Sequence, residues 1–367
     1  MLLSKLRRVS MSKMDRLNRL RGKMSEHDIP ALFVTKQENC RYLTGFTGSS
    51  GFILVTQDES YFLTDFRYVE QAEEQIPKDF KVIKHEFPMV KTLNELLKKL
   101  NIDQIYLEKN HITYEDYERY QENLEADIIP EKDLVSELRK IKDKEEVEIL
   151  SKAIHIADEA FVHIVNFIEE GVTERDLALE LEYFMKKQGA EDISFDIIVA
   201  SGHRSSLPHG VASNKKIQNG EFIKMDFGAK YQGYCSDMTR TVVLGKASEE
   251  QKKIYDLVFQ AQMNALDNIH AGLTGKEADS FARLTIEKED YGNYFGHGLG
   301  HGVGMKVHES PRLSPNHEDE LVPGMTVTVE PGVYIPQWGG VRIEDIVLVQ
   351  EQGCEVLTRS TKDLIEI

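Results

Sequence analysis

Five residues between positions 226 and 344 of this 367-residue chain are of the types that bind divalent metal ions. Four are carboxylates and one is an imidazole, a mostly hard-oxygen set that suits Mn²⁺ and tolerates Co²⁺ or Zn²⁺. Four carboxylates are more than one divalent ion usually needs, so the set predicts two ions that share a bridging water, a known arrangement for hydrolysis. The candidate ligands are Asp226, Asp237, His301, Glu330 and Glu344.

The two aspartates lie in residues 221–244, where two apolar runs around a short polar turn are typical of a β-hairpin. A turn at 230–233, centred between Tyr231 and Gln232, would put Asp226 directly opposite Asp237. Side chains that face each other across a hairpin lie roughly 5 Å apart, and like charges there are destabilising. A bridging cation would remove that penalty.

The two glutamates repeat the arrangement in residues 325–348, which are expected to turn within 336–340 and to place Glu330 opposite Glu344. Each hairpin could instead be shifted by one residue, which would point its acids to solvent. Two acidic pairs together with a histidine cluster favour the metal site over that alternative.

The histidine cluster begins four residues before the candidate ligand His301, at His297, in a segment with glycine at every second position from 296 to 304. So many glycines argue against a helix. The segment is therefore expected to be a strand or loop whose backbone closely approaches another group. His209 in Leu-Pro-His-Gly and His308 in Val-His-Glu-Ser-Pro are further candidate site residues.

Taken together, these motifs resemble those of the pita-bread metallopeptidases, and in particular the Xaa-Pro peptidases, which include aminopeptidase P and prolidase. Tyr-Leu-Thr-Gly-Phe-Thr-Gly at 42–48 and Thr-Asp-Phe-Arg-Tyr at 64–68 look like the creatinase-type N-terminal domain of the same branch. The resemblance implies an α/β (α+β) chain. It would comprise an N-terminal extension (1–13), a creatinase-type α/β domain (14–136) and a pita-bread catalytic domain (144–367).

The resemblance also implies how the metal ligands divide. Asp226 and Asp237 would hold one metal, with Asp237 also reaching the other. His301 would bind the second metal, and Glu330 and Glu344 would complete the site. The enzyme would then cleave the bond between an N-terminal residue and proline in small peptides.

The catalytic and substrate-binding roles follow from the same resemblance. Glu330 matches the position that takes the proton of the attacking hydroxide, while His209 and His308 match positions near the scissile carbonyl. His297 matches a histidine that touches substrate or lies just outside the metal ligands. Arg342, two residues before Glu344, is expected to orient the carboxylates.

Arg312 bears on the length of the substrate. It follows His308 by four residues, where short prolidases have an arginine that binds the free carboxylate of a dipeptide and many aminopeptidase P relatives have a small residue. A guanidinium suits a carboxylate well, which favours an Xaa-Pro dipeptidase over an aminopeptidase acting on longer peptides. A solvated loop arginine is the alternative interpretation.

Three other classes are weighed against this hypothesis. Methionine aminopeptidase shares the metal set but normally lacks the N-terminal domain. Creatinase shares both domains but uses no metal. A non-catalytic binding module on the same scaffold would have a degraded ligand set, whereas this chain keeps all five ligands.

Composition favours an ordinary soluble enzyme. Lysine and arginine number 45 and aspartate and glutamate 62, so the net charge of −17 makes nucleic acid a poor partner. Three scattered cysteines favour a reducing cytoplasm. No apolar run is long enough to cross a membrane, and basic residues 1–10 lack the apolar region of a signal peptide. The resemblance implies a homodimer or higher homo-oligomer.

The elements that must position the site are read from periodicity. Helices are expected at 13–26, 67–75, 90–100 and 144–168, and strands at 31–35, 51–56, 60–64 and 104–107. Thr173, Ser248 and Thr274 are expected to start three more helices, the last two through capping boxes. At two places in the C-terminal part, helices are followed by a hairpin. This suggests an internally duplicated half-barrel, although no sequence repeat proves it.

Overall fold

A computed structural model describes residues 12–367 of the chain. The predicted extension over residues 1–13 therefore lies almost entirely outside the described residues. The chain forms two compact units, which divide between Arg139 and Lys140.

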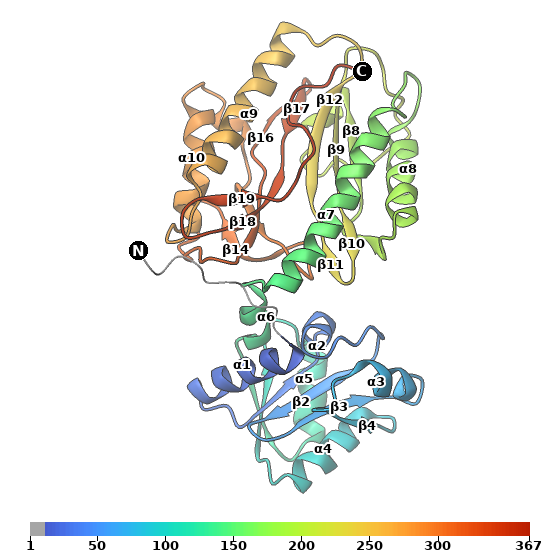
Figure 1. Cartoon of the computed structure of the whole chain (residues 1–367), viewed down its shortest axis with the longest axis vertical. Helices are drawn as coiled ribbons and strands as arrows, with labels where there is room; N and C mark the ends of the chain where they lie inside the picture. The colour runs from blue at the N-terminus through green and yellow to red at the C-terminus, as the bar shows by residue number, and fades with distance from the viewer. Residues whose placement is uncertain (1–11) are drawn as a thin grey trace. The chain divides into compact units, whose positions relative to one another are not determined.

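The N-terminal unit is a six-stranded mixed sheet with helices packed on it (Figure 1). The strand order is β4-β3-β2-β1-β5-β6. The strands are β1 (Ala31–Val34), β2 (Phe52–Thr56), β3 (Ser60–Thr64), β4 (Lys81–Lys84), β5 (Gln104–Glu108) and β6 (Asp127–Glu131). The helices are α1 (Lys13–Glu26), α2 (Gln37–Thr44), α3 (Val69–Gln75), α4 (Met89–Lys99), α5 (Tyr114–Asn123) and α6 (Leu134–Arg139).

The C-terminal unit contains two helix pairs, each followed by antiparallel strands (Figure 1). The first half comprises α7 (Lys144–Val165), α8 (Glu174–Lys187), β7 (Asp192–Ile193), β8 (Ile198–Ser201), the 3₁₀ helix η1 (Gly202–Ser206), β9 (Phe222–Phe227), β10 (Ala229–Tyr231), β11 (Tyr234–Cys235) and β12 (Met238–Val243). The second comprises α9 (Glu249–Asn268), α10 (Gly275–Glu287), the 3₁₀ helix η2 (Gly292–Tyr294), β13 (Gly300–Gly302), β14 (Glu309–Leu313), β15 (Thr326–Val329), β16 (Gly332–Ile335), β17 (Gly339–Arg342), β18 (Asp345–Val349) and β19 (Cys354–Val356).

Each half has its own apolar core between its helix pair and its strands. In the first half, residues of α7 and α8 pack on β8, β9 and β12. In the second, residues of α9 and α10 pack on β14 to β18. In the view of Figure 1, the two helix pairs lie on opposite sides of the strands. The strands that carry the acidic pairs are thus held between two helical layers.

The helix starts predicted from the sequence are confirmed. Thr173, Ser248 and Thr274 each accept a hydrogen bond from the backbone N–H three residues later. In all three helices the side chain of that third residue bonds back to the cap, which completes a capping box.

The register predicted for the first hairpin is wrong. Asp226 lies opposite Thr239 rather than opposite Asp237. The reason is the turn, which consists of Gln232 and Gly233 with φ of 46° and 86° and so is centred one residue later than expected. Positive φ at both central positions is the conformation that two-residue hairpins favour. Since alternate residues face the same side, Asp237 still projects to the face of Asp226.

The register predicted for the second hairpin is confirmed. Val329 pairs with Asp345 on one side of the acidic pair, and Gly332 pairs with Arg342 on the other. Glu330 and Glu344 occupy the gap between these two ladders, where the proline at position 331 has no N–H to donate. The backbone at Glu330 and Glu344 therefore lies outside the regular strand pairing, at the position of the candidate metal ligands.

Candidate metal centre

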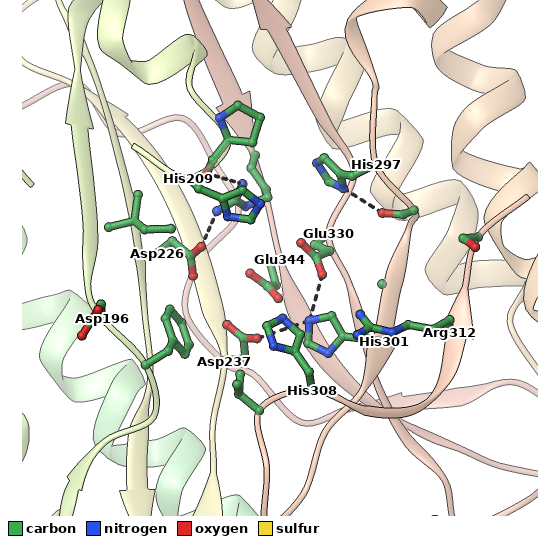
Figure 2. A pocket seen from close by; sticks show the side chains of 18 of the residues that line it. Asp196, His209, Asp226, Asp237, His297, His301, His308, Arg312, Glu330 and Glu344 are labelled. Carbon is green, nitrogen blue, oxygen red and sulfur yellow. Dashed lines mark hydrogen bonds and ion pairs between the residues drawn. The ribbon is translucent and has the colours of Figure 1, made fainter. Parts of the chain in front are cut away.

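All five candidate ligands line one cavity of about 730 Å³ in the C-terminal unit (Figure 2). The same cavity is lined by the other side chains singled out from the sequence: His209, His297, His308, Arg312 and Arg342. Residues from both halves of the C-terminal unit, between positions 195 and 344, therefore share one site, and the carboxylates face its interior (Figure 2). Phe195 and Asp196, which sequence reasoning did not select, also line it.

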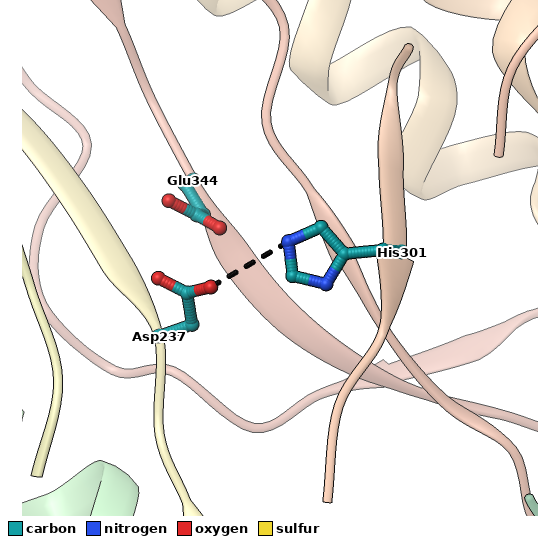
Figure 3. Close-up of side chains that lie close together, drawn as sticks. All are labelled: Asp237, His301 and Glu344. Atoms are coloured by element: carbon teal, nitrogen blue, oxygen red, sulfur yellow. Dashed lines mark ion pairs between the residues drawn. The ribbon is translucent and has the colours of Figure 1, made fainter. Parts of the chain in front are cut away.

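Three of the candidates form a compact ligand cluster. One potential ligand atom from each of Asp237, His301 and Glu344 lies within 4.8 Å of the others, and all three side chains are buried (Figure 3). His301 Nε2 lies 3.7 Å from Asp237 Oδ2 and 3.2 Å from an oxygen of Glu330. Glu330 is thus a fourth potential metal-binding side chain, next to the cluster of Asp237, His301 and Glu344.

His301 presents Nε2 to the carboxylates because its other nitrogen is already engaged. Nδ1 lies 3.1 Å from the backbone oxygen of Gly302, and the backbone N–H of His301 donates to Thr328 Oγ1 at 3.0 Å. A donor role for Nδ1 leaves Nε2 with its lone pair, the form in which imidazole binds metals. The glycines around it are required by close packing, since a Cβ on Gly300 would lie 2.0 Å from the oxygen of Thr328.

Asp226 is held from outside the cluster by Arg342. The guanidinium donates to Asp226 Oδ2 through Nη2 and to Thr239 Oγ1 through Nε at 2.9 Å. Thr239 in turn donates to Glu344 Oε2 at 2.7 Å. One arginine therefore orients a carboxylate from each hairpin, as expected for Arg342 from the sequence.

The other oxygen of Asp226, Oδ1, is buried and has no hydrogen-bond partner among the described residues. A buried carboxylate oxygen without a partner carries a large desolvation penalty. Oδ1 is therefore an available ligand atom, and a divalent cation is the group that its charge and its surroundings fit.

The electrostatics of the cluster make the same point. Burial raises the pKa of Asp237 and of Glu344 well above the usual range, and the neighbouring carboxylates raise both further. Burial also raises the pKa of Asp226, although the charge of Arg342 opposes it. One guanidinium does not neutralise this much buried acid, whereas one or two divalent cations would.

Glu330 behaves differently from the other carboxylates. Burial alone would raise the pKa of Glu330, but the contact with His301 and the charges of His301, His297 and Arg342 outweigh it and lower that pKa to about 2. Thr328 also donates to Glu330 at 3.0 Å. Glu330 is therefore the acid of the cluster that stays ionised most readily.

The remaining histidines surround the ligands at different depths. His297 has both ring nitrogens engaged, Nδ1 at 2.8 Å from Gly298 O and Nε2 at 2.8 Å from Tyr334 Oη. The ring of His308 lies 4.3 Å from that of His301, and burial followed by the charges of His301 and Arg312 lowers the pKa of His308 to about 4.

Tyr334 is a site residue that sequence reasoning missed. It accepts from Arg342 Nη1 at 2.9 Å, which leaves its own proton for His297 Nε2. A tyrosine in an apolar strand gives no chemical signal in a single sequence. Its role becomes visible only when the β16–β17 ladder brings it beside Arg342.

The comparisons with known proteins agree with this geometry. Residues 148–351 match the model of metallopeptidase family M24, and residues 16–141 match that of the creatinase/prolidase N-terminal domain. The chain belongs to metallopeptidase family M24. The mixed α/β architecture predicted for its two parts is thereby confirmed.

Several relatives are similar over nearly the whole chain. A structure described as Xaa-Pro dipeptidase from Bacillus anthracis matches with a TM-score of 0.95 and 46% identity, covering 97% of this chain and 100% of that one. An Xaa-Pro dipeptidase of Pyrococcus furiosus is 42% identical over 96% of this chain and 99% of its own length. The X-Pro aminopeptidase of Thermotoga maritima matches with a TM-score of 0.89 and 39% identity, covering 96% and 99%.

Among the helices of residues 12–367, none combines the length and the apolar character that crossing a bilayer requires.

Proposed function

We propose that this chain is a dinuclear-metal Xaa-Pro dipeptidase, which hydrolyses the bond between an N-terminal residue and a C-terminal proline. The similarity to the dipeptidases of B. anthracis and P. furiosus supports the reaction. The observation that carries the choice of a dipeptide is the position of Arg312.

Arg312 lies on β14 directly opposite His301 of β13. Opposed residues of an antiparallel pair project to the same face, so Arg312 extends along the cavity wall beside the metal ligands (Figure 2). Its guanidinium is exposed and pairs with no carboxylate among the described residues. An unpaired guanidinium at this place suits the terminal carboxylate of a short substrate.

The residues present fit the two metal ions that the family implies. Asp226 and Asp237 would hold one ion, with Asp237 also reaching the second. His301 would bind the second ion, and Glu330 and Glu344 would complete the site. Bound divalent ions would polarise the peptide carbonyl and lower the pKa of the attacking water. Mn²⁺ is the proposed ion because the donor set is mostly carboxylate oxygen.

Side chains of the chain itself would transfer the proton and stabilise the developing charge. Glu330 accepts the proton of the attacking water, for which it must be ionised, and later delivers it to the leaving proline nitrogen. His308 and His209, on opposite sides of the cavity in Figure 2, donate hydrogen bonds to the oxygen on which charge develops. His297 acts indirectly, because Tyr334 and Gly298 already engage its ring.

Selection for proline follows from what the proline nitrogen lacks. As part of a peptide bond it carries no proton, so no hydrogen bond to the scissile N–H can contribute to recognition. The site must then recognise the ring by its shape and the terminal carboxylate by charge. Arg312 would supply the second of these contacts.

An aminopeptidase that acts on longer Xaa-Pro peptides is the second candidate, because the aminopeptidase of T. maritima is also similar over nearly the whole chain. In a longer peptide the carboxylate lies beyond the proline, so a contact with Arg312 would contribute little. The two candidates therefore make different predictions for substitutions of Arg312.

We also propose a domain division at 14–136 and 144–367 and a cytoplasmic location. The domain matches at 16–141 and 148–351 support the division. Support for the location comes from the three cysteines, which are all free, as a reducing compartment would keep them.

The decisive experiment compares Arg312→Ala with the wild type on an Xaa-Pro dipeptide and on a tripeptide with the same first two residues. Removing a charge-assisted contact costs about 1.5–3 kcal/mol, so kcat/KM for the dipeptide should fall roughly 10- to 100-fold. The loss for the tripeptide should be much smaller. Arg175→Ala serves as the matched control, because Arg175 is exposed on α8 and does not line the cavity.

Equal losses on both substrates would make Arg312 a structural residue. A wild-type protein that cleaves only the longer peptide would move the assignment to the aminopeptidase.

A further inference from the structure

His209 belongs to a surface segment, residues 202–212, whose two ends are tied to one buried carboxylate. Glu174, in the first turn of α8, accepts from the backbone N–H and hydroxyl of Ser201 at 2.7 and 3.0 Å. It also accepts from the N–H and hydroxyl of Ser213 at 3.1 and 2.6 Å. We call residues 202–212 the His209 segment. Its ends are fixed, yet the described residues make no hydrogen bond to the exposed ring of His209 itself.

The middle of the His209 segment is held by Lys224. The ammonium of Lys224 donates to the backbone oxygens of Ser205, Leu207 and Pro208 at 3.1, 2.6 and 3.4 Å. An ammonium has three donors and no acceptor, so these carbonyls use all three. All of them belong to the four residues that immediately precede His209.

Burying the ammonium of Lys224 costs free energy, and a role for the lysine would explain why this cost is tolerated. Lys224 is 0% exposed, and no ion pair joins it to a carboxylate in the part of the chain that the structure describes. Its ammonium lies 4.9 Å from the centre of the Tyr334 ring. A buried ammonium carries a large desolvation penalty, whereas an apolar side chain on β9 would fill the same space without it. What the ammonium adds is the attachment of the His209 segment.

The attachment also connects the segment to the metal ligands. Lys224 and Asp226 are two residues apart on β9 and so face the same side. Arg342, which donates a hydrogen bond to Asp226 through Nη2, also donates to the same Pro208 oxygen through Nη1 at 3.2 Å. The backbone just before His209 is therefore fixed to the strand and to the arginine that also place Asp226.

We propose that Lys224 is a positioning residue for His209. It holds the preceding backbone against β9, so that the imidazole faces the substrate carbonyl at a fixed place relative to Asp226. This inference rests on the proposed peptidase function and deepens it, because it assigns a role to a buried cation outside the metal ligands.

The first test is Lys224→Met, which keeps the length and the apolar stem of the side chain and removes its three donors. With two bound ions per chain retained, kcat on an Xaa-Pro dipeptide should fall by about 10²-fold, the cost of a small misplacement of a catalytic group. KM should change less. Lys216→Met is the control, since Lys216 is an exposed lysine next to Lys215 and does not line the cavity.

A double-mutant cycle distinguishes positioning from general damage. If Lys224 acts through His209, then Lys224→Met should cost almost nothing further in a His209→Ala background. Additive losses would overturn the proposal. Should Lys224→Met not fold, the same cycle is run with Lys224→Arg, whose planar fork matches the three carbonyls poorly.

A second readout needs no substrate and no turnover. In either Lys224 variant, amide hydrogen exchange should speed up in the His209 segment and remain unchanged in α9 and α10. Unchanged exchange in the segment would contradict the proposal even if activity fell. A different result would separate the two proposals. If the wild-type protein is inactive on every Xaa-Pro peptide but exchange in the Lys224 variants changes as expected, the proposed function is rejected and the attachment by Lys224 stands.

Discussion

At the scale of single residues, the carboxylates of the site fall into two electrostatic environments. Asp226, Asp237 and Glu344 have raised pKa values because they are buried together, whereas Glu330 has a lowered one because His301 lies against it. Two environments for chemically similar acids are a common basis for different roles. Glu330 is thus the acid that both contacts a ligand histidine and stays ionised.

Glu330→Gln is expected to reduce kcat by about 10²–10⁴-fold, the usual cost of losing a positioned general base. KM for an Xaa-Pro dipeptide should change much less. Steady-state kinetics with parallel metal analysis measures both. His308→Ala is the comparison variant, because its ring neighbours His301 without belonging to the ligand cluster, and it should lower kcat while keeping both ions. A normal kcat at full metal content in Glu330→Gln would remove Glu330 from the reaction.

At the scale of elements, the two hairpins bring the acids together, and their turns set the register. The turn of the first hairpin has positive φ at Gln232 and Gly233. A Cβ in the left-handed region costs about 1–2 kcal/mol. Gly233→Ala should therefore destabilise the protein by that amount, which thermal denaturation would detect as a lower Tm.

Gln232→Asn is the matched control for Gly233→Ala, because asparagine visits the left-handed region more readily than glutamine. It should leave Tm unchanged or slightly higher. A Gly233→Ala protein with the wild-type Tm would show that the turn does not take the conformation described.

The hairpins also show what a single sequence can and cannot predict. Apolar runs and polar turns predicted both hairpins, and glycine spacing predicted the close approach at Gly300. The register of the first hairpin was missed because four residues offered a turn and only their φ values select the central pair. The helix α2 was missed because no side chain caps it, and its five buried residues make tertiary packing its main support.

Contacts between distant segments could not be predicted from the sequence, for a different reason. Tyr334, Lys224 and Glu174 have no motif of their own, and each acts through partners that the fold brings to it from distant parts of the chain. The candidate ligands, in contrast, could be found because four carboxylates and a histidine in two hairpins and a glycine-rich segment already indicate a divalent metal site, although Asp226 lies opposite Thr239 rather than Asp237.

At the scale of the whole molecule, the N-terminal unit is expected to mediate self-association. It exposes two large aromatic side chains, Phe66 at 79% and Phe87 at 95%, and the resemblance to Xaa-Pro peptidases implies a dimer formed partly through this unit. Light scattering at micromolar concentration should give twice the mass of the chain. A mass of one chain would refute the prediction.

The C-terminal unit concentrates buried acid from both of its halves, and this charge links metal binding to stability. Since the folded-state pKa values of Asp226, Asp237 and Glu344 are raised, the unfolded chain loses those protons first. Without metal, stability should therefore fall as pH rises above about 4, the unfolded value of a carboxyl group. Thermal denaturation of chelated protein across this range measures the fall, which saturating Mn²⁺ should abolish.

The central claim, that the two acidic pairs and His301 form a metal centre for Xaa-Pro hydrolysis, is tested most directly by one titration. Metal-free protein is titrated with Mn²⁺ while bound ions per chain and cleavage of an Xaa-Pro dipeptide are followed together. If the metal centre carries out the reaction, cleavage should be absent at zero metal and should rise to a maximum as binding approaches two ions per chain. Full turnover after verified removal of all metal, or no cleavage at full occupancy, would contradict it.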